Sequence, residues 1–192
     1  MKIAFCGIDG CGKSTQIEKL KNRLVDDGDK VKILKYQFTP YHLYKEKLVK
    51  EELLSLGTAY DFIRVNMEAE KNIDNLDFVL YDRHKICYLA LAKAYECENI
   101  NDIVKLYSLI EQPDLTVYFE NSVNTSMQRI LSRNKPLSNR EELEFLKKFK
   151  NAYEFFFDLG YYKDLVIIDA NKSIEKVEEQ VIEKVYKKVK RR

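Results

Sequence analysis

The 192-residue chain has no tryptophan, and it contains only six glycines and three prolines. This scarcity of glycine and proline excludes collagen-like and low-complexity chains, and no linker rich in either residue divides the sequence. The length suits one domain spanning residues 1–192. We therefore look for every function inside a single fold.

The sequence also lacks a large excess of either charge, the cysteine spacing typical of metal sites, and long apolar runs. The net charge is only +2, so no whole-protein field favours nucleic acid or a membrane surface as a partner. The four cysteines form no Cys-x-x-Cys pair, and no apolar stretch is long enough for a signal peptide or a membrane span. We expect a reducing cytoplasm as the setting, with no nucleic-acid or membrane partner.

Short apolar or β-branched runs alternate with longer segments of helical period. Strands are expected near Lys2–Cys6, Val31–Tyr36, Phe78–Tyr81, Leu115–Glu120 and Leu165–Asp169. Helices are expected near Lys13–Asp27, Thr58–Asn75, Arg83–Glu96, Asn101–Glu111, Val123–Arg133, Arg140–Leu159 and Ser173–Lys190, with a further helical segment over Tyr41–Leu56. This alternation predicts an α/β fold of three layers, a five-stranded parallel sheet with helices on both faces.

The first expected strand leads directly into a phosphate-binding loop. The run Gly7-Ile8-Asp9-Gly10-Cys11-Gly12-Lys13-Ser14-Thr15 fits the pattern G-x-x-x-x-G-K-[ST], with a strand before it and a helix after it. Its glycines let successive backbone N–H groups point at one phosphate chain, and the helix adds its positive dipole end. Lys13 would reach the β- and γ-phosphates, and Ser14 would ligate Mg²⁺. The loop predicts a site for a nucleoside triphosphate at Gly7, Gly10, Cys11, Gly12, Lys13, Ser14 and Thr15.

The third expected strand ends in Asp82-Arg83-His84. Parallel sheets bind ligands at the carboxyl ends of their strands, so these side chains should face the phosphate loop. The Asp82 carboxylate could hold Mg²⁺ or its water shell, or could instead cap the following helix. Arg83 is a natural anion clamp at this edge, and we expect it to bind a second phosphate.

Several motifs accompany the phosphate loop, namely the acidic Asp9 inside it, Tyr60-Asp61-Phe62-Ile63-Arg64, Asp82-Arg83-His84, Pro113-Asp114-Leu115-Thr116, and Arg129, Arg133 and Arg140. Together they resemble the thymidylate kinase family, the P-loop enzymes that pass a phosphoryl group from ATP to dTMP. The likeness extends over nearly the whole chain. The resemblance implies ATP, Mg²⁺ and dTMP as ligands, a homodimer, and a short lid at about residues 132–142.

The resemblance also implies roles for single residues. Asp9 would contact the deoxyribose 3′-hydroxyl or the surroundings of the metal, Tyr60 would stack on the base, and Arg64 and Arg83 would hold the acceptor phosphate. Spacing alone favours core positions for Tyr60 and Phe62, and the resemblance reverses this expectation for Tyr60 but not for Phe62. Because the phosphate loop contains no arginine, the catalytic arginine should come from the lid, as Arg133 or Arg140. The dimer would form through the helices near Thr58–Asn75 and Arg83–Glu96.

Other features depart from the family pattern. Thr39-Pro40-Tyr41-His42 replaces the family's arginine- or aspartate-containing turn after the second strand, and Cys87 and Tyr88 occupy helix positions that usually carry small or amide side chains. These departures leave open a diverged relative that phosphorylates another nucleotide or nucleoside. A nucleotide-binding regulatory module without turnover is a third hypothesis, although such a module would not need the second phosphate clamp.

Overall fold

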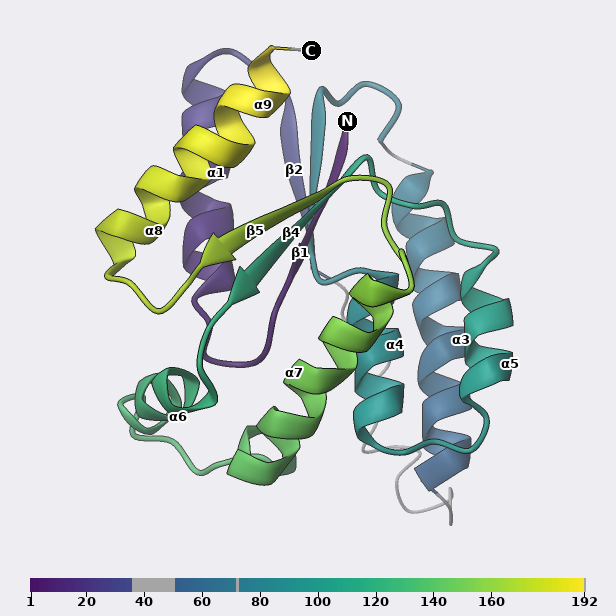
Figure 1. The fold of residues 1–192 in the computed structure, drawn as a ribbon. Coiled ribbons are helices and arrows are strands. Elements are labelled where there is room, and N and C mark those ends of the chain that lie inside the picture. The colour runs from purple at the N-terminus through teal and green to yellow at the C-terminus, as the bar shows by residue number, and fades with distance from the viewer. Residues whose placement is uncertain (36–50, 72, 192) are drawn as a thin grey trace.

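A computed structural model describes residues 1–35, 51–71 and 73–191. Its sheet contains β1 (Lys2–Cys6), β2 (Val31–Lys35), β3 (Phe78–Asp82), β4 (Leu115–Glu120) and β5 (Leu165–Asp169). The strand order is β2-β3-β1-β4-β5, and every neighbouring pair is parallel (Figure 1). The predicted five-stranded parallel sheet is therefore confirmed.

Strands β1 and β3 lie side by side in the middle of the sheet. Both are almost continuously apolar and buried, as expected for strands that are covered by helices on both faces. In their register Phe5 pairs with Asp82, so β1 and β3 end at the same edge of the sheet. The phosphate loop and the Asp82-Arg83 pair therefore emerge next to each other.

The helices are α1 (Lys13–Asp26), α3 (Glu51–Glu70), α4 (Lys85–Ala94), α5 (Ile100–Tyr107), α6 (Val123–Leu131), α7 (Leu143–Asp158), α8 (Ile174–Val181) and α9 (Lys187–Lys190). A short 3-10 turn, η1 (Asn139–Glu141), precedes α7, and a π-turn, η2 (Ile182–Tyr186), joins α8 to α9. Each expected helix has a counterpart in these elements. Of the helical segment expected over Tyr41–Leu56, residues 41–50 lie outside the described residues, and residues 51–56 belong to α3.

Two apolar clusters cover the two faces of the sheet. On one face α1, α8, η2 and α9 pack against the sheet through side chains such as Ile17, Leu24 and Val181. On the other face α3, α4, α5 and α7 pack together, and their buried side chains include Phe62, Leu89 and Phe156. Figure 1 shows the same division into three layers. The alternating side chains of the buried strands supply both clusters, because successive residues of a strand point to opposite faces.

Helix α4 begins at Lys85, two residues later than its sequence pattern suggests. Arg83 has a positive φ of 78°, which a right-handed helix cannot contain. The chain therefore turns at Arg83 before the helix starts. Almost every residue of α4 is buried, so this helix lies inside the chain. It offers no exposed face for the dimer contact expected of it.

Within the described part of the chain, no helix combines the length and the apolar character needed to cross a lipid bilayer.

Candidate active site

The phosphate loop is a tight turn whose glycines cannot be replaced freely. Gly7, Gly10 and Gly12 all have positive φ. A Cβ on Gly7 would lie 2.8 Å from the carbonyl oxygen of Phe119, and one on Gly10 would lie 2.6 Å from that of Ser126. Backbone from two neighbouring segments therefore encloses the loop, which explains why these positions carry no side chain.

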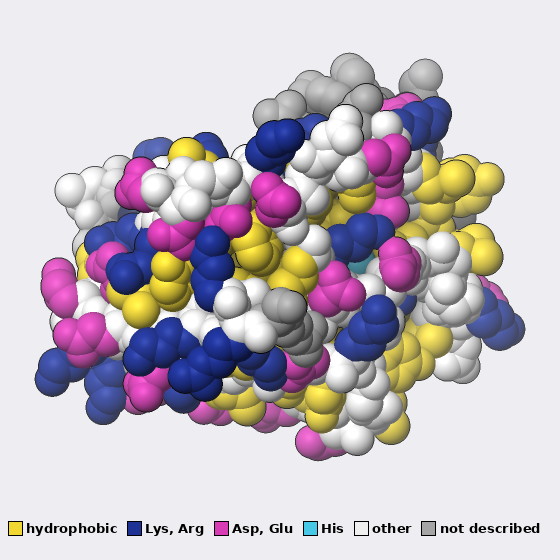
Figure 2. All heavy atoms as spheres, turned by 90° about the horizontal axis from the view of Figure 1, so that it is seen from above, with side chains coloured by type: hydrophobic (Ala, Val, Ile, Leu, Met, Phe, Trp, Pro, Cys, Tyr) yellow, Lys and Arg dark blue, Asp and Glu magenta, His cyan; other side chains and the backbone are white. Residues whose placement is uncertain are grey.

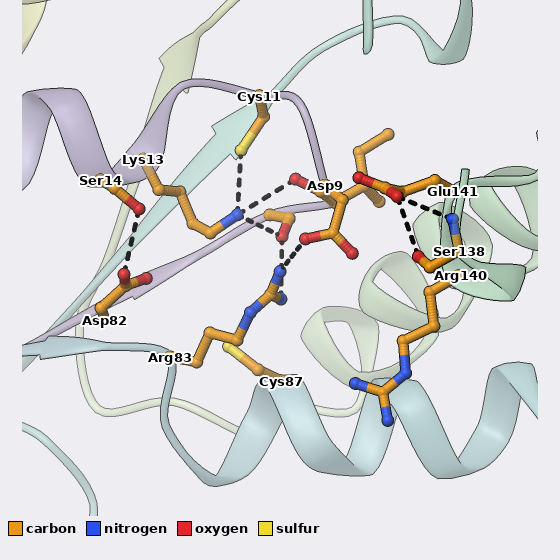
Figure 3. Close-up of polar contacts among 12 residues, drawn as sticks. Asp9, Cys11, Lys13, Ser14, Asp82, Arg83, Cys87, Ser138, Arg140 and Glu141 are labelled. Carbon is orange, nitrogen blue, oxygen red and sulfur yellow. Dashed lines mark hydrogen bonds and ion pairs between the residues drawn. The ribbon is translucent and has the colours of Figure 1, made fainter. Parts of the chain in front are cut away.

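Lys13 lies in the centre of this loop and is only 5% exposed. Its ammonium group donates to the carbonyl oxygens of Gly7 at 2.8 Å and Ile8 at 3.1 Å, and to the sulfur of Cys11 at 3.3 Å (Figure 3). These contacts hold one positive charge at the mouth of the loop. They place Lys13 where a bound polyphosphate would run along the backbone N–H groups.

Asp82 and Ser14 face each other from the ends of β3 and the phosphate loop. The hydroxyl of Ser14 donates to a carboxylate oxygen of Asp82 at 3.0 Å, and the ammonium of Lys35 lies 3.6 Å from the same oxygen. Among the described residues, no group of three or more His, Cys, Asp or Glu side chains could hold a metal ion. Two hard oxygen ligands suit Mg²⁺, which commonly binds one or two protein oxygens and takes its other ligands from water and phosphates. The pair therefore fits the expected metal position.

Arg83 and Asp9 form an ion pair on the other side of the loop. Arg83 also donates to the carbonyl oxygen of Gly7 at 3.3 Å and to the hydroxyl of Tyr153 at 3.5 Å, and its guanidinium lies over the ring of Phe149. Burial opposes the charge of each partner. The mutual attraction outweighs it, so the pKa of Asp9 is lowered and the pKa of Arg83 is raised. Both groups stay ionised at neutral pH.

These groups line one cavity of about 420 Å³. Its wall includes the following residues predicted for the site from the sequence: Asp9, Gly10, Gly12, Lys13, Ser14, Thr15, Asp82, Arg83, Arg133 and Arg140. Gly7 and Cys11 belong to the loop and contribute to its shape, but they do not line the cavity. The volume lies in the range of small-molecule sites. Donor-side and acceptor-side candidates therefore share one cavity.

The lid arginines reach this cavity from the segment before α7. Arg133 pairs with Glu141 at 3.3 Å, and the Nε of Arg140 donates to the hydroxyl of Tyr95 at 3.3 Å. Both arginines also help to lower the pKa of Asp9, which places their charges close to the loop. Arg129 instead donates to the backbone of Lys172 and is absent from the cavity wall.

Tyr60 and Arg64 do not line this cavity. Tyr60 is 72% exposed on α3, so the alternative that it is a core aromatic is wrong, whereas Phe62 is buried as expected. Arg64 pairs with Asp61 at 2.9 Å and with Glu68 at 3.1 Å along the same helix. Residues 36–50, which precede α3, lie outside the described residues. The acceptor-binding roles of Tyr60 and Arg64 stay predictions.

Lys35, Leu91 and Phe149 line the cavity but were not predicted from the sequence. Lys35 ends β2, so the rule that ligands bind at strand ends could have identified it. Leu91 follows Cys87 by one helical turn and shares its face of α4. Phe149 has no such signal, because only the packing of α7 against α4 brings it there.

The surface seen from above in Figure 2 carries side chains of both charges, and dark-blue Lys and Arg side chains gather in the lower left of the view with magenta Asp and Glu side chains beside them.

Comparisons with known proteins agree with this geometry. The family model for thymidylate kinase matches residues 5–181. The chain is 26% identical to a thymidylate kinase of Fervidobacterium nodosum over 197 residues, covering 95% of this chain and 96% of the relative. It is 29% identical to a probable thymidylate kinase of Staphylothermus marinus, covering 89% of this chain and 87% of the relative.

Among solved structures, the fold is similar to that of deoxyadenosine kinase from M. mycoides with bound dATP. The TM-score is 0.74 at 21% identity, and the match covers 97% of this chain and 100% of the other. A second structure of that kinase, with bound dCTP, gives a TM-score of 0.69. These likenesses show a shared fold.

Proposed function

The chain belongs to the thymidylate kinase family, and from this premise we propose that it transfers the γ-phosphoryl group of ATP to dTMP to give dTDP. Family membership makes it a phosphotransferase, which argues against a regulatory module without turnover. The observation that carries the assignment to this site is the convergence of two cations on one backbone atom. Lys13 and Arg83 both donate to the carbonyl oxygen of Gly7, at 2.8 and 3.3 Å.

Two cations this close can hold two phosphates in line. Lys13 belongs to the loop that would hold the donor triphosphate, and Arg83 comes from the neighbouring strand end. An acceptor phosphate held by Arg83 would meet the donor at the position that both cations face. Because a monophosphate oxygen is already ionised, it can attack phosphorus without a general base. Positioning and charge neutralisation therefore account for the chemistry asked of this site.

Ser14 and Asp82 are the residues that we assign to Mg²⁺. When bound there, the ion would neutralise charge on the donor phosphates. The hydrogen bond between these two side chains already brings both oxygens to one point at the end of β3. Lys35 neutralises the Asp82 carboxylate from its exposed side.

Arg133 and Arg140 are assigned to the charge that develops during transfer. Both line the cavity from the lid segment, and each is held by an exposed hydrogen bond, Arg133 to Glu141 and Arg140 to Tyr95. A cation that approaches only when the lid closes stabilises the transition state more than bound ATP. Closure would also exclude water, which suppresses hydrolysis of ATP.

A second candidate substrate class is favoured by the wall formed by Cys87, Tyr88 and Leu91. None of these side chains offers the amide that could form paired hydrogen bonds with a pyrimidine edge. A diverged specificity for another nucleotide or nucleoside therefore remains the alternative.

An ADP-release assay with a panel of nucleoside monophosphates and nucleosides tests both candidates. We expect kcat/KM to be highest for dTMP, and the Lys13→Ala variant, purified in the same way, controls for contaminating kinases. Turnover of a nucleoside but of no monophosphate would contradict the assignment of Arg83 to a second phosphate. A preference for another monophosphate would keep the site and change the base.

We also propose a homodimer formed through α3, because α4 is buried inside the chain. Met67 is a large apolar side chain of this helix and is 64% exposed. Light scattering should give twice the chain mass of 22.7 kDa. Met67→Glu should shift the mass toward that of one chain, whereas a monomer in the parent protein would exclude the dimer.

A further inference from the structure

Two cysteines meet beneath the cavity. Cys6 is the last residue of β1, and Cys87 lies in the first turn of α4. Their sulfur atoms are 3.2 Å apart and share a hydrogen bond, although the two residues are 81 positions apart in the sequence. Both side chains are buried, but Cys87 forms part of the cavity wall. Cys87 is therefore the member of the pair that borders the cavity.

The surroundings of Cys87 favour its thiolate. Its sulfur accepts a hydrogen bond from the backbone N–H of His84, and the charge of Arg83 acts on it. Burial opposes ionisation, yet these groups together with the hydrogen bond to Cys6 lower the pKa of Cys87 to about 6. The pKa of Cys6 is raised by its burial and by the same hydrogen bond. The pair therefore combines a nucleophilic sulfur with an adjacent thiol that keeps its proton.

We propose that hydrogen peroxide oxidises Cys6 and Cys87 to a disulfide, which makes the pair a reversible modification site under the catalytic cavity. In the first step the Cys87 thiolate attacks one peroxide oxygen and the O–O bond breaks. The Cys87 sulfenic acid forms, and the departing hydroxide becomes water by taking the proton that the thiol had lost. In the second step the Cys6 sulfur attacks the sulfenic sulfur, so that the S–S bond forms and the S–OH bond breaks. The hydroxide leaves as a second water with the Cys6 proton.

The geometry requires only a short approach of the two sulfur atoms. A disulfide bond is about 2.05 Å long, so the sulfurs must move together by roughly 1.2 Å from their present 3.2 Å. Intracellular disulfides are mostly transient and redox-sensing rather than structural. A pair at a site wall, with one reactive and one resolving thiol, has the arrangement that such a role needs.

The bond would act directly on the phosphate clamps. Cys6 precedes Gly7, whose carbonyl oxygen accepts from both Lys13 and Arg83. Cys87 lies in the helix turn that follows Arg83, so a displacement on either side changes the position of this guanidinium relative to the loop. Displacements of about 1 Å in an active site can reduce turnover about a hundredfold. We expect oxidation to reduce activity on that scale and dithiothreitol to restore it.

Mass spectrometry of the full chain tests bond formation without reference to any substrate. Hydrogen peroxide should remove about 2 Da from the chain, the mass of two hydrogen atoms, and peptide mapping should link Cys6 to Cys87. Cys97→Ser is the matched control, because Cys97 is also a buried cysteine of the same cluster but follows the C-terminal end of α4, whereas Cys87 lies in its first turn. This variant should form the cross-link as the parent does. Failure of the proposed substrate assignment would leave this readout unchanged.

Variants of the pair connect the bond to the loss of activity. Cys6→Ser and Cys6→Ala should both stop at the sulfenic acid on Cys87, which dimedone would trap, and Cys87→Ser should form no cross-link. Each activity is compared with that of the same variant before peroxide, and circular dichroism confirms its fold. A link through Cys11 or Cys97, a link between chains, or no mass loss would overturn the proposal. So would activity loss in Cys97→Ser without the cross-link.

Discussion

Replacing Arg83 by alanine or by glycine separates the charge that this residue supplies from the backbone strain that it carries. Arg83 is one of three non-glycine residues with a positive φ among the described residues, and its φ is 78°. Both substitutions remove the guanidinium and its contacts with Asp9, Gly7 and Tyr153. Only glycine adopts this backbone conformation without a steric penalty. The loss of the guanidinium is therefore common to both variants, and the difference in stability between them reports the backbone at this position.

The expected magnitude follows from two opposing terms. A left-handed conformation costs a residue with a Cβ about 1–2 kcal/mol, which glycine recovers. Glycine also makes the unfolded chain more flexible, at a cost of about 0.4–1 kcal/mol relative to alanine. The remainder makes Arg83→Gly more stable than Arg83→Ala by about 1 kcal/mol. In a chain of this size the midpoint of thermal unfolding should be about 2–4 °C higher.

Thermal unfolding of both variants and steady-state kinetics in both substrates measure the two quantities. Glu96, with a φ of 56°, provides the matched control outside the cavity wall. Glu96→Gly should exceed Glu96→Ala in stability by a similar amount, with unchanged kinetics. Both Arg83 variants should show a raised KM for the acceptor and a lowered kcat, with a smaller change in the KM for ATP.

An Arg83→Gly variant that is less stable than Arg83→Ala would refute the strain argument. Equal effects of both variants on the ATP and acceptor constants would refute the assignment of Arg83 to the acceptor phosphate. The two outcomes are independent because stability is measured without substrates.

Four further outcomes can be measured on the same protein. Lys13→Ala should lower kcat about a hundredfold or more because it removes a cation from the transferring phosphate, and a change confined to KM in steady-state assays would contradict this. Tyr60→Ala should weaken acceptor binding by about 1–3 kcal/mol in a titration while Tyr60→Phe binds nearly as the parent does, and because the side chain is 72% exposed neither should unfold earlier. Of Arg133→Ala, Arg140→Ala and the double variant, at least one should lose about 10³-fold in kcat, whereas rates within a few-fold of the parent in all three would exclude a catalytic lid arginine. Burial, with Lys85 and Lys2 nearby, lowers the pKa of His84 to about 3, so below pH about 6.5 the unfolded chain binds a proton that the folded chain does not. Stability should therefore fall as the pH falls, by about 2 kcal/mol at pH 5, and His84→Phe should flatten this dependence in urea unfolding.

The phosphate loop shows how far sequence patterns reach. Its glycine spacing encodes a backbone path that few other residues permit, and the structure contains that path between β1 and α1. The positions of Asp82 and Arg83 followed from a rule of topology, that parallel strands end at one edge. Local chemistry and fold class, together with the resemblance to the thymidylate kinase family for Asp9, Arg133 and Arg140, named most of the residues of the cavity wall.

Helix boundaries were less predictable where a residue adopts a backbone conformation that differs from its intrinsic helix propensity. The pattern of α4 includes Arg83, and arginine is a good helix former. Contacts with Asp9 and Tyr153 hold Arg83 in a left-handed turn instead, so the helix starts at Lys85. A sequence window around α4 contains no trace of these partners, because they lie 74 and 70 positions away.

The sequence by itself determined the order of strands and helices, the loop that binds phosphate, and the cations near it. These features depend on local backbone preference and on apolar periodicity, which act over a few residues. Only the tertiary structure decided that Arg83 pairs with Asp9, that Phe149 lines the cavity, and that Cys6 meets Cys87. Such contacts depend on the packing of α4 and α7 against the sheet, where the fit of many side chains sets positions that no short pattern specifies.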